Sequence, residues 1–384
     1  MVSGVQKEAM LALKENNHER KESVVSVCNR FFSHSTPKTI MCIFFVEKVK
    51  KVLTKKKKCS TIITVRGIPS AKDKHREKGD FMKKICVIGS INMDLVIETE
   101  YPPVMGETVF GKGFKTIPGG KGANQAVAAA LLGNEVSFIG AVGEDSFGEQ
   151  LGENLKSFNV DVSGVECTGT SGIAMIVVSG GDNTIILESG ANNKVTPEFI
   201  DRNIDLIKKS DIVIFQLEIP SETVLYAMKA ARALGKTVLL NPAPVSGFLP
   251  EMLGYTDILV ANEHEASAML DMKITETESA KNACGKYLGR GVKQIIITLG
   301  ANGCVYNSGN EIRHAKAFKV KAVDSTAAGD SFIGAFCAKY KNTDVDAAVK
   351  YAQATSAIVV SRKGASTSIP TREEVEEFLS RETK

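Results

Sequence analysis

From Glu135 onward, short apolar strand patterns alternate with longer helix patterns, and this alternation restricts the fold more than any other feature of the chain. Strands joined by helices of this length run parallel, in a sheet that helices cover on both faces. The chain is therefore predicted to form an α/β fold with a doubly wound, mostly parallel sheet. The expected strands are 85–88, 135–142, 211–217, 238–240, 258–260 and 294–298, and the expected helices are 147–158, 197–208, 221–234, 277–288, 331–340, 345–361 and 372–379.

Residues 95–117, before this alternation, and residues 172–188, within it, show a different pattern. The first stretch alternates in polarity and contains Pro102-Pro103, which a crossover helix would not tolerate. The second contains the hairpin signal Gly180-Gly-Asp-Asn183. Both stretches predict paired antiparallel strands. We expect them to form a small separate β-sheet that acts as a lid.

Residues 1–81 differ in charge from the rest of the chain. They hold 18 Lys+Arg and 8 Asp+Glu, whereas residues 82–384 hold 30 Lys+Arg and 36 Asp+Glu. We expect 1–81 to be a disordered or non-native extension, with Met82 as the natural start of one domain over 82–384. A basic tail can also bind nucleic acid or an acidic surface, or act as an address. The mildly acidic body gives no indication of nucleic-acid binding.

The cysteines and apolar runs limit the class of protein further. The 8 cysteines show no C-x-x-C spacing, which argues against a zinc site and against a disulfide scaffold. Reduced thiols in a cytoplasmic protein are the expected state. No apolar run approaches the roughly 18 residues that a membrane-spanning helix needs. We therefore expect no membrane partner.

The stretch 322–332 predicts an anion site. It joins an apolar strand expected over 318–323 to a helix that begins near Gly329. Ala327, Ala328 and Gly329 are small enough for their amides to approach a ligand, and the helix adds its positive end. Asp330 follows in the first helical turn. It either caps the helix or takes a proton from an alcohol that attacks a bound phosphoryl group, and the stretch alone does not decide between these roles.

A second glycine turn, 118–125, opens an Ala-rich helix. It is not a Walker A loop, because Gly122 follows Lys121 where Ser or Thr is required. Lys121 and Asn124 at a helix start suit hydrogen bonding to a polyhydroxylated ligand, although the turn also reads as a simple helix cap. Polar residues recur where expected strands end, which is where open α/β sheets bind ligands. They are Asn92, Glu218, Asn241, Asn262 and Thr298.

Several motifs resemble the ribokinase (phosphofructokinase B) family of sugar kinases. The two most specific are Gly119-Gly-Lys-Gly-Ala-Asn-Gln-Ala126 and Asp324-Ser-Thr-Ala-Ala-Gly-Asp-Ser-Phe332. Further matches in the same order are 89–94, 216–218, 241–244, 262–265 and 362–364. The resemblance spans about residues 83–380. It implies a ribokinase-like fold and the ATP-dependent phosphorylation of D-ribose at O5.

The resemblance also implies roles for individual residues. Asp330 would be the catalytic base, and the amides of Ala327, Ala328 and Gly329 would form the anion hole. The sugar would contact Asn92, Met93, Asp94, Gly120, Lys121, Gly122, Ala123, Asn124 and Glu218, together with Asp330. ATP would lie against Asn262, Thr298, Leu299, Gly300, Ala301, Asn302, Gly303, Gly329 and Gln353.

Two metal ions are implied by the same resemblance. Glu265 would organise Mg²⁺ through water. A potassium ion would lie beside the anion hole, at Asp324, Thr326, Val359, Arg362, Gly364 and Ser368. Gln353 departs from the family pattern, since some members have a His there. A homodimer through the lid strands is expected by analogy.

Two rival hypotheses remain open at this level. The first is a related kinase for another sugar or a nucleoside, because the family shares its anion hole. The second is a sugar-binding or nucleotide-binding regulator that has lost catalysis. Asp330, Gly329 and Glu265 together argue against this second reading.

Overall fold

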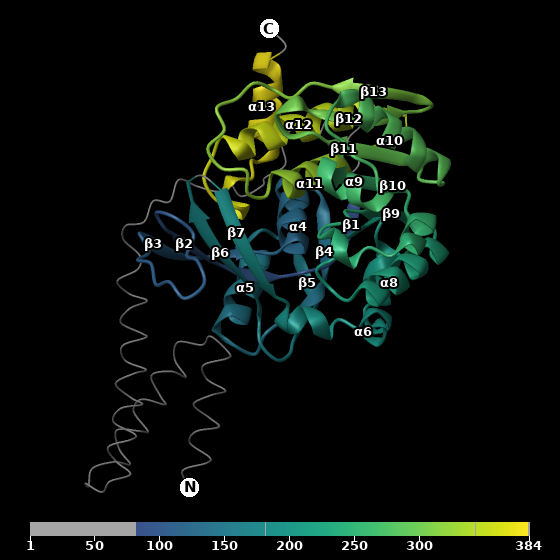
Figure 1. Ribbon diagram of the computed structural model, residues 1–384. Helices are drawn as coiled ribbons and strands as arrows, with labels where there is room; N and C mark the ends of the chain where they lie inside the picture. Colours follow the sequence, from purple (N-terminus) through teal and green to yellow (C-terminus); the bar gives the residue numbers. More distant parts are fainter. Residues whose placement is uncertain (1–81, 181, 342, 383–384) are drawn as a thin grey trace, which may run out of the picture. The chain divides into compact units, whose positions relative to one another are not determined.

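A computed structural model describes residues 82–180, 182–341 and 343–382 (Figure 1). The expectations for residues 1–81 lie outside these ranges. Within them, the described chain forms a nine-stranded sheet and a separate four-stranded sheet. None of the helices in the described ranges is long and apolar enough to cross a membrane.

The large sheet has the strand order β13-β12-β11-β10-β9-β8-β1-β4-β5. Its strands are β1 (Lys84–Ile88), β4 (Glu135–Val142), β5 (Asp161–Cys167), β8 (Ile212–Phe215), β9 (Thr237–Leu240), β10 (Ile258–Asn262), β11 (Gln294–Thr298), β12 (Cys304–Ser308) and β13 (Glu311–Ala315). From β11 to β5 all neighbours pair in parallel, whereas β12 and β13 extend the edge as an antiparallel hairpin. The predicted parallel sheet is confirmed, although β5, β12 and β13 were not foreseen.

Helices cover both faces of this sheet, as predicted. One layer consists of α4 (Lys121–Leu131), α5 (Ser146–Ser157), α11 (Ala328–Lys339), α12 (Val345–Val360) and α13 (Arg372–Glu382). The other consists of α6 (Pro197–Arg202), α7 (Ile204–Lys209), α8 (Ser221–Ala233), α9 (Glu263–Leu270) and α10 (Thr277–Gly289). Alternate residues of β1 serve the two layers: Ile85 and Val87 enter the first core, and Cys86 and Ile88 enter the second.

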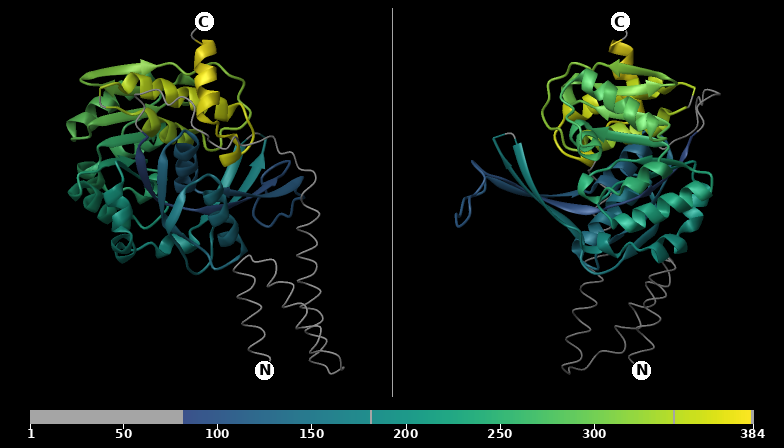
Figure 2. Two further views of the ribbon diagram at one scale, coloured as in Figure 1. Left: turned by 180° about the vertical axis from the view of Figure 1, so that it is seen from behind. Right: turned by 45° about the vertical axis from the view of Figure 1, so that its right-hand side comes forward.

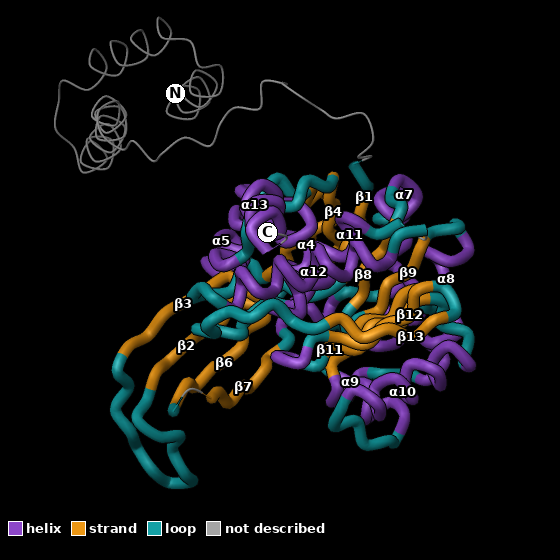
Figure 3. The backbone as a smooth tube through the Cα atoms, turned by 90° about the horizontal axis from the view of Figure 1, so that it is seen from above, coloured by secondary structure: helices purple, strands orange, loops and turns teal. Residues whose placement is uncertain are grey.

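The small sheet has the order β3-β2-β6-β7 and projects from the main body (Figures 2 and 3). It consists of β2 (Asn92–Glu98), β3 (Gly113–Gly119), β6 (Gly172–Ser179) and β7 (Asp182–Glu188). The β2–β3 and β6–β7 pairs are antiparallel, and β2 and β6 join them in parallel. The predicted small sheet is confirmed. Because β2 begins only four residues after β1 ends, its first residues stay at the carboxyl edge of the large sheet.

Two local expectations were wrong. The helix expected over 197–208 is divided at Asn203, whose side chain bonds the Phe199 carbonyl at 3.0 Å. Residues 318–323 form no strand, because the chain there meets the end of α12, where the Val323 amide bonds the Val360 carbonyl.

Short 3-10 helices complete the chain between these elements. They are η1 (Gly190–Lys194), η2 (Val245–Gly247), η3 (Pro250–Tyr255), η4 (Gly300–Asn302) and η5 (Ser366–Ser368).

Gly334 lets α11 pack closely against α4. A Cβ at Gly334 would lie 2.6 Å from the Ala128 Cβ and 2.7 Å from the Ala129 amide nitrogen. We expect Gly334→Ala to destabilise the protein by at least about 2 kcal/mol, since overpacking between backbones cannot relax. Gly285→Ala is the matched control, because Gly285 is exposed on α10 and the nearest atom to a Cβ there would be Ile312 Cδ1, 3.9 Å away. It should stabilise by about 0.5–1 kcal/mol through helix propensity. Urea unfolding measures both, and equal effects would contradict the packing argument.

Candidate active site

Asp330 is the centre of the candidate site. It lies in the first turn of α11 and is buried, with 9% of its surface exposed. Its Oδ2 accepts a hydrogen bond from Asn124 Nδ2 at 3.2 Å, and its Oδ1 accepts one from Gln125 Nε2 at 2.9 Å. The N-cap of α11 is Ala327, without a side-chain cap. The carboxylate is therefore bonded across to α4 and is not the N-cap of α11, and its expected role as a base stays a prediction.

The loop before α11 presents backbone amides. Ala327 adopts a left-handed conformation with φ 59°, and α11 begins directly after it at Ala328. This reversal of hand makes successive N–H groups converge at the positive end of the helix. A Cβ at Gly329 would meet no atom within 4 Å, so the space in front of this turn is open. This backbone conformation is compatible with the predicted anion site, which stays a prediction.

Glu218 lies at the centre of the residues that are expected to bind the sugar. Its Oε2 accepts hydrogen bonds from Ser90 Oγ at 2.5 Å and from the Lys121 amide at 3.2 Å, with Asn92 Nδ2 at 3.4 Å. Asn192, which the sequence reasoning missed, donates to Asn92 Oδ1 at 2.7 Å and so orients it. These polar groups come from the loop after β1, from β2, from the start of α4, from η1 and from the loop after β8. They share the carboxyl edge of the sheet.

Strong electrostatic coupling joins Asp94, Glu218, Asp330 and Lys121. Burial, followed by repulsion from Glu218 and Asp330, raises the pKa of Asp94 to about 7. Burial also raises the pKa of Glu218. Although burial opposes it, the surrounding carboxylates raise the pKa of Lys121, with Asp330 contributing most. Lys121 is therefore a cation that interacts electrostatically with Asp94, Glu218 and Asp330.

Glycines bring the turn before α4 against β2. Gly120 has φ 92°, and a Cβ there would lie 2.7 Å from the Asn92 amide nitrogen. At Gly122 a Cβ would lie 2.7 Å from the Ser90 amide nitrogen. Asn92 and Asp94 share one face of β2, whereas Met93 points into the core. Ala123 is also a core residue, so Met93 and Ala123 can offer a ligand only their backbone.

The residues expected to hold the nucleotide follow β10 and β11. Asn262 and Glu265 form a capping box at the start of α9: the Glu265 amide donates to Asn262 Oδ1 at 2.8 Å, and Glu265 Oε2 accepts from the Asn262 amide at 2.9 Å. Burial raises the pKa of Glu265. Thr298 begins a turn through η4 that closes when the Leu299 amide bonds the Gly303 carbonyl at 2.8 Å.

Gln353 is buried beside the β12–β13 hairpin. Its Nε2 donates to the Ala315 carbonyl at 3.0 Å and to Cys304 Sγ at 3.4 Å. Its amide donors are thus committed to protein atoms. The contact of Gln353 with the nucleotide stays a prediction. Such a contact would have to use the side-chain oxygen of Gln353.

Two segments expected to hold a potassium ion meet at Asp324. Its Oδ1 accepts bonds from the Thr326 amide at 2.9 Å and the Thr326 hydroxyl at 2.6 Å, and its Oδ2 accepts from the Gly364 amide at 3.0 Å. These bonds, outweighing burial, lower the pKa of Asp324. The Arg362 side chain turns away to pair with Glu374, so only its backbone can face this loop. In the described ranges, no group of three or more His, Cys, Asp or Glu side chains is placed to hold a metal ion.

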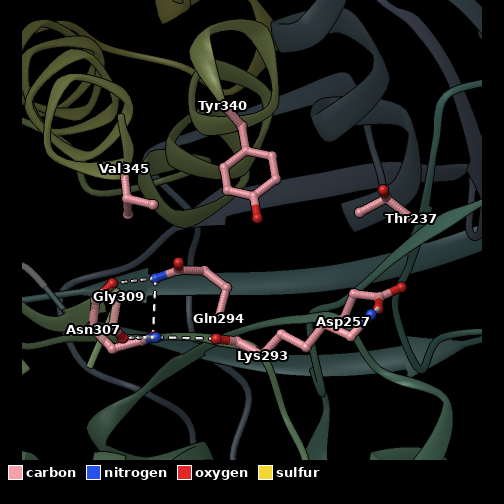
Figure 4. Close-up of a pocket in the computed structure, with 8 residues that line it drawn as sticks. All are labelled: Thr237, Asp257, Lys293, Gln294, Asn307, Gly309, Tyr340 and Val345. Carbon is pink, nitrogen blue, oxygen red and sulfur yellow. Dashed lines mark hydrogen bonds and ion pairs between the residues drawn. The ribbon is translucent and has the colours of Figure 1, made fainter. Parts of the chain in front are cut away.

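A separate cavity of about 260 Å³ lies at the opposite, amino-terminal edge of the sheet (Figure 4). Its walls include Thr237 and Gln294 at strand starts, and the Tyr340 hydroxyl points across it toward Gln294. None of the residues expected to bind substrate lines this cavity. The candidate site is therefore not this cavity but the group of side chains at the carboxyl edge of the sheet.

Comparisons with known proteins agree with this geometry. The chain matches the pfkB family of carbohydrate kinases over residues 82–372. It is 41% identical over 303 residues to a ribokinase of Bacillus subtilis, which covers 78% of this chain and 100% of that protein. It is 38% identical over 304 residues to a deoxyribokinase of Salmonella typhimurium, which covers 77% and 98%.

A solved structure of Arabidopsis thaliana ribokinase complexed with ribose and ATP matches with a TM-score of 0.71 at 32% identity, covering 78% of this chain and 99% of that one. The chain therefore belongs to the pfkB family of carbohydrate kinases. The family resemblance drawn from the sequence motifs is confirmed.

The raised pKa of Asp94 has a consequence for stability. In the unfolded chain Asp94 ionises near pH 4, whereas in the folded protein it keeps its proton to about pH 7. Folding stability should therefore fall as the pH rises through this window. We expect Asp94→Asn, measured without ligands, to exceed the wild type in unfolding free energy by about 2–4 kcal/mol at pH 8 and to match it near pH 4.

Asp161→Asn, at an exposed position of β5, is the control and should show no such pH-dependent gap. Equal unfolding curves for Asp94→Asn and the wild type at every pH would contradict the coupling described above.

Proposed function

We propose that this chain transfers the γ-phosphoryl group of ATP to O5 of D-ribose, giving D-ribose 5-phosphate and ADP. The observation that carries the proposal is Asp330, a buried carboxylate fixed by two amides beside the amide-rich turn of α11. Asp330 would take the proton of the 5-hydroxyl while O5 bonds to phosphorus and the bond to ADP breaks. The amides of Ala327 to Gly329 would bind the transferring group.

Ribose is favoured over other acceptors by the character of the sugar side. Asn92, Lys121 and Asn124 supply donors, and Asp94 and Glu218 supply acceptors, all near one edge of the sheet. A polyol needs both, and a site of this kind penalises an analogue that lacks a hydroxyl. Because one relative is a deoxyribokinase, the 2-hydroxyl of the acceptor is the feature to test.

Mg²⁺ would be held through water by Glu265. The residues fit this role, because the capping box with Asn262 fixes the carboxylate, and the electrostatic influence of Glu265 on Lys121 connects it with the site. When bound, the ion neutralises charge on the phosphates of ATP. The nucleotide itself would lie along the turn from Thr298 to Gly303, next to Asn262.

Potassium would lie between the loop around Asp324 and the segment 359–368. Backbone carbonyls such as that of Val359, with the Asp324 carboxylate, suit a monovalent cation, and the bond from Gly364 already joins the two segments. Gly364 is required there, since it has φ 101° and a Cβ would lie 2.4 Å from Thr367 Oγ1. A cation would stiffen the loop without contact to the sugar.

The activity test uses wild-type protein and Asp330→Asn with ATP and Mg²⁺. Acceptors are D-ribose, deoxyribose, fructose, adenosine and none, each with and without potassium. We expect ribose-dependent ADP release that potassium increases, and a fall in kcat of about 10²–10⁴-fold in Asp330→Asn with ribose binding retained. Near-normal turnover by the variant would contradict the role of Asp330 as the base.

The same assay separates the alternatives. Turnover on another acceptor would keep the chemistry and overturn the choice of sugar. Tight ribose binding without turnover on any acceptor would indicate a binding protein. A chain beginning at Met82 with full activity would show that residues 1–81 are dispensable for catalysis.

We also propose that the small sheet pairs with a second copy of this chain. Exposed apolar side chains lie on it, with Ile186 at 65% exposure and Met175 at 52%, and Phe110 in the loop between β2 and β3 is 94% exposed. Met175 and Ile186 are opposite each other in β6 and β7, so they form one continuous patch. Patches of this kind mark interfaces, and β3 and β7 are sheet edges open to pairing.

Ile186→Lys should convert a dimer to a monomer at micromolar concentration in sedimentation equilibrium, because a charge would be buried in the contact. Tyr226→Lys, an exposed aromatic residue on α8, is the control and should leave the mass unchanged. A monomeric wild type would contradict the proposal.

Reduced thiols support a cytoplasmic location as part of this proposal. Cys86, Cys284, Cys304 and Cys337 are free and buried, and burial raises the pKa of each thiol to about 12.

A further inference from the structure

The buried amide of Gln125 connects the carboxylate of Asp330 to the edge of the sheet. Gln125 lies in α4, one residue after Asn124, and none of its surface is exposed. Its Nε2 donates to Asp330 Oδ1 at 2.9 Å and to Asn241 Oδ1 at 3.2 Å. Its Oε1 accepts from Gln216 Nε2 at 2.6 Å. Each polar atom of the side chain therefore has a protein partner.

These contacts fix which way the amide faces. Because Gln125 Oε1 is held by Gln216, the NH₂ group must face Asp330. Gln216 is confined by packing: its Oε1 is buried without a hydrogen-bond partner among the described residues, and a Cβ at Gly89, the residue after β1, would be only 1.8 Å from it. Asn241 is anchored by its own bond to the Val260 carbonyl at 3.0 Å.

The location of Asp330 explains why such an anchor is needed. A carboxylate in the first turn of a helix is attracted to the amides of its own helix terminus. In this site those amides are the proposed anion hole, and a carboxylate bonded to them would block the phosphoryl group. The hydrogen bonds from α4 draw Asp330 away from that position and toward the sugar side.

We propose that Gln125 is a positioning residue, which, through Gln216 and Asn241, holds the Asp330 carboxylate at the geometry for accepting the sugar proton and clear of the anion hole. This role rests on the proposed function. It assigns no contact with substrate to Gln125. Since a displacement of about 1 Å can cost 10²-fold in rate, its loss should act on turnover rather than on binding.

The test is a double-mutant cycle on kcat with Gln125→Met and Asp330→Asn. Met matches Gln in length and removes all of its hydrogen bonds. We expect Gln125→Met to lower kcat about 10–100-fold with the KM for ribose changed less than about 3-fold. In the Asp330→Asn background the same change should alter kcat less than about 3-fold, because the carboxylate that it positions is absent.

Two further variants allow the positioning role to be tested if Gln125→Met folds poorly. Gln216→Met retains the bond to Asp330 and frees only the far side of the amide, so it should lower kcat by about 3–10-fold. Gln294→Met, at a buried glutamine in the cavity of the amino-terminal edge, is the matched control and should leave kcat unchanged below its melting temperature.

The outcomes separate the two proposals. An additive cycle, in which Gln125→Met is as harmful without Asp330 as with it, would overturn the positioning role while leaving ribose phosphorylation intact. A rise in KM with unchanged kcat would do the same. A wild-type chain without turnover on any acceptor would overturn the proposed function and this role together.

Discussion

The close packing of α11 on α4 is the constraint on which the candidate site depends. The two helices come from distant parts of the chain, and Gly334 and Ala128 let their backbones approach. That approach brings Asn124 and Gln125 within hydrogen-bonding distance of Asp330. A wider separation would leave a carboxylate at a helix terminus with its own amides as nearest partners. The position of the Asp330 carboxylate therefore depends on small residues in the contact between the two helices.

The acidic cluster shows what this site costs in stability. Asp94, Glu218 and Asp330 lie near one another around Lys121, and their repulsion and burial raise the pKa of Asp94 to about 7. A sugar that donates hydroxyl hydrogens to these oxygens would relieve the strain. Binding energy would then come partly from groups that the empty protein holds unfavourably, which is common at functional sites.

Much of the fold and part of the site could be predicted from the sequence, because the signals were local. Strand-helix alternation predicted the parallel sheet, and two glycine-containing motifs predicted the turns before α4 and α11. Gln125 and Asn192 were missed, since an amide inside a helix or a 3-10 turn has no local signature, and its partners lie about 100 or more residues away. The left-handed Ala327 was also missed, because alanine rarely adopts that conformation.

The sequence separation of the partners also bears on how the protein is made. Asn124 and Asp330 are 206 residues apart, and α11 and α12 cover the core that α4 and β1 begin. During synthesis the apolar surface of α4 therefore stays uncovered until the last fifth of the chain has been made. Contacts of such high sequence separation form late and slowly. A nascent chain that ends before α11 would expose the apolar surface of α4 and would lack Asp330. We therefore expect the native state to form only after the C-terminal helices have been synthesised.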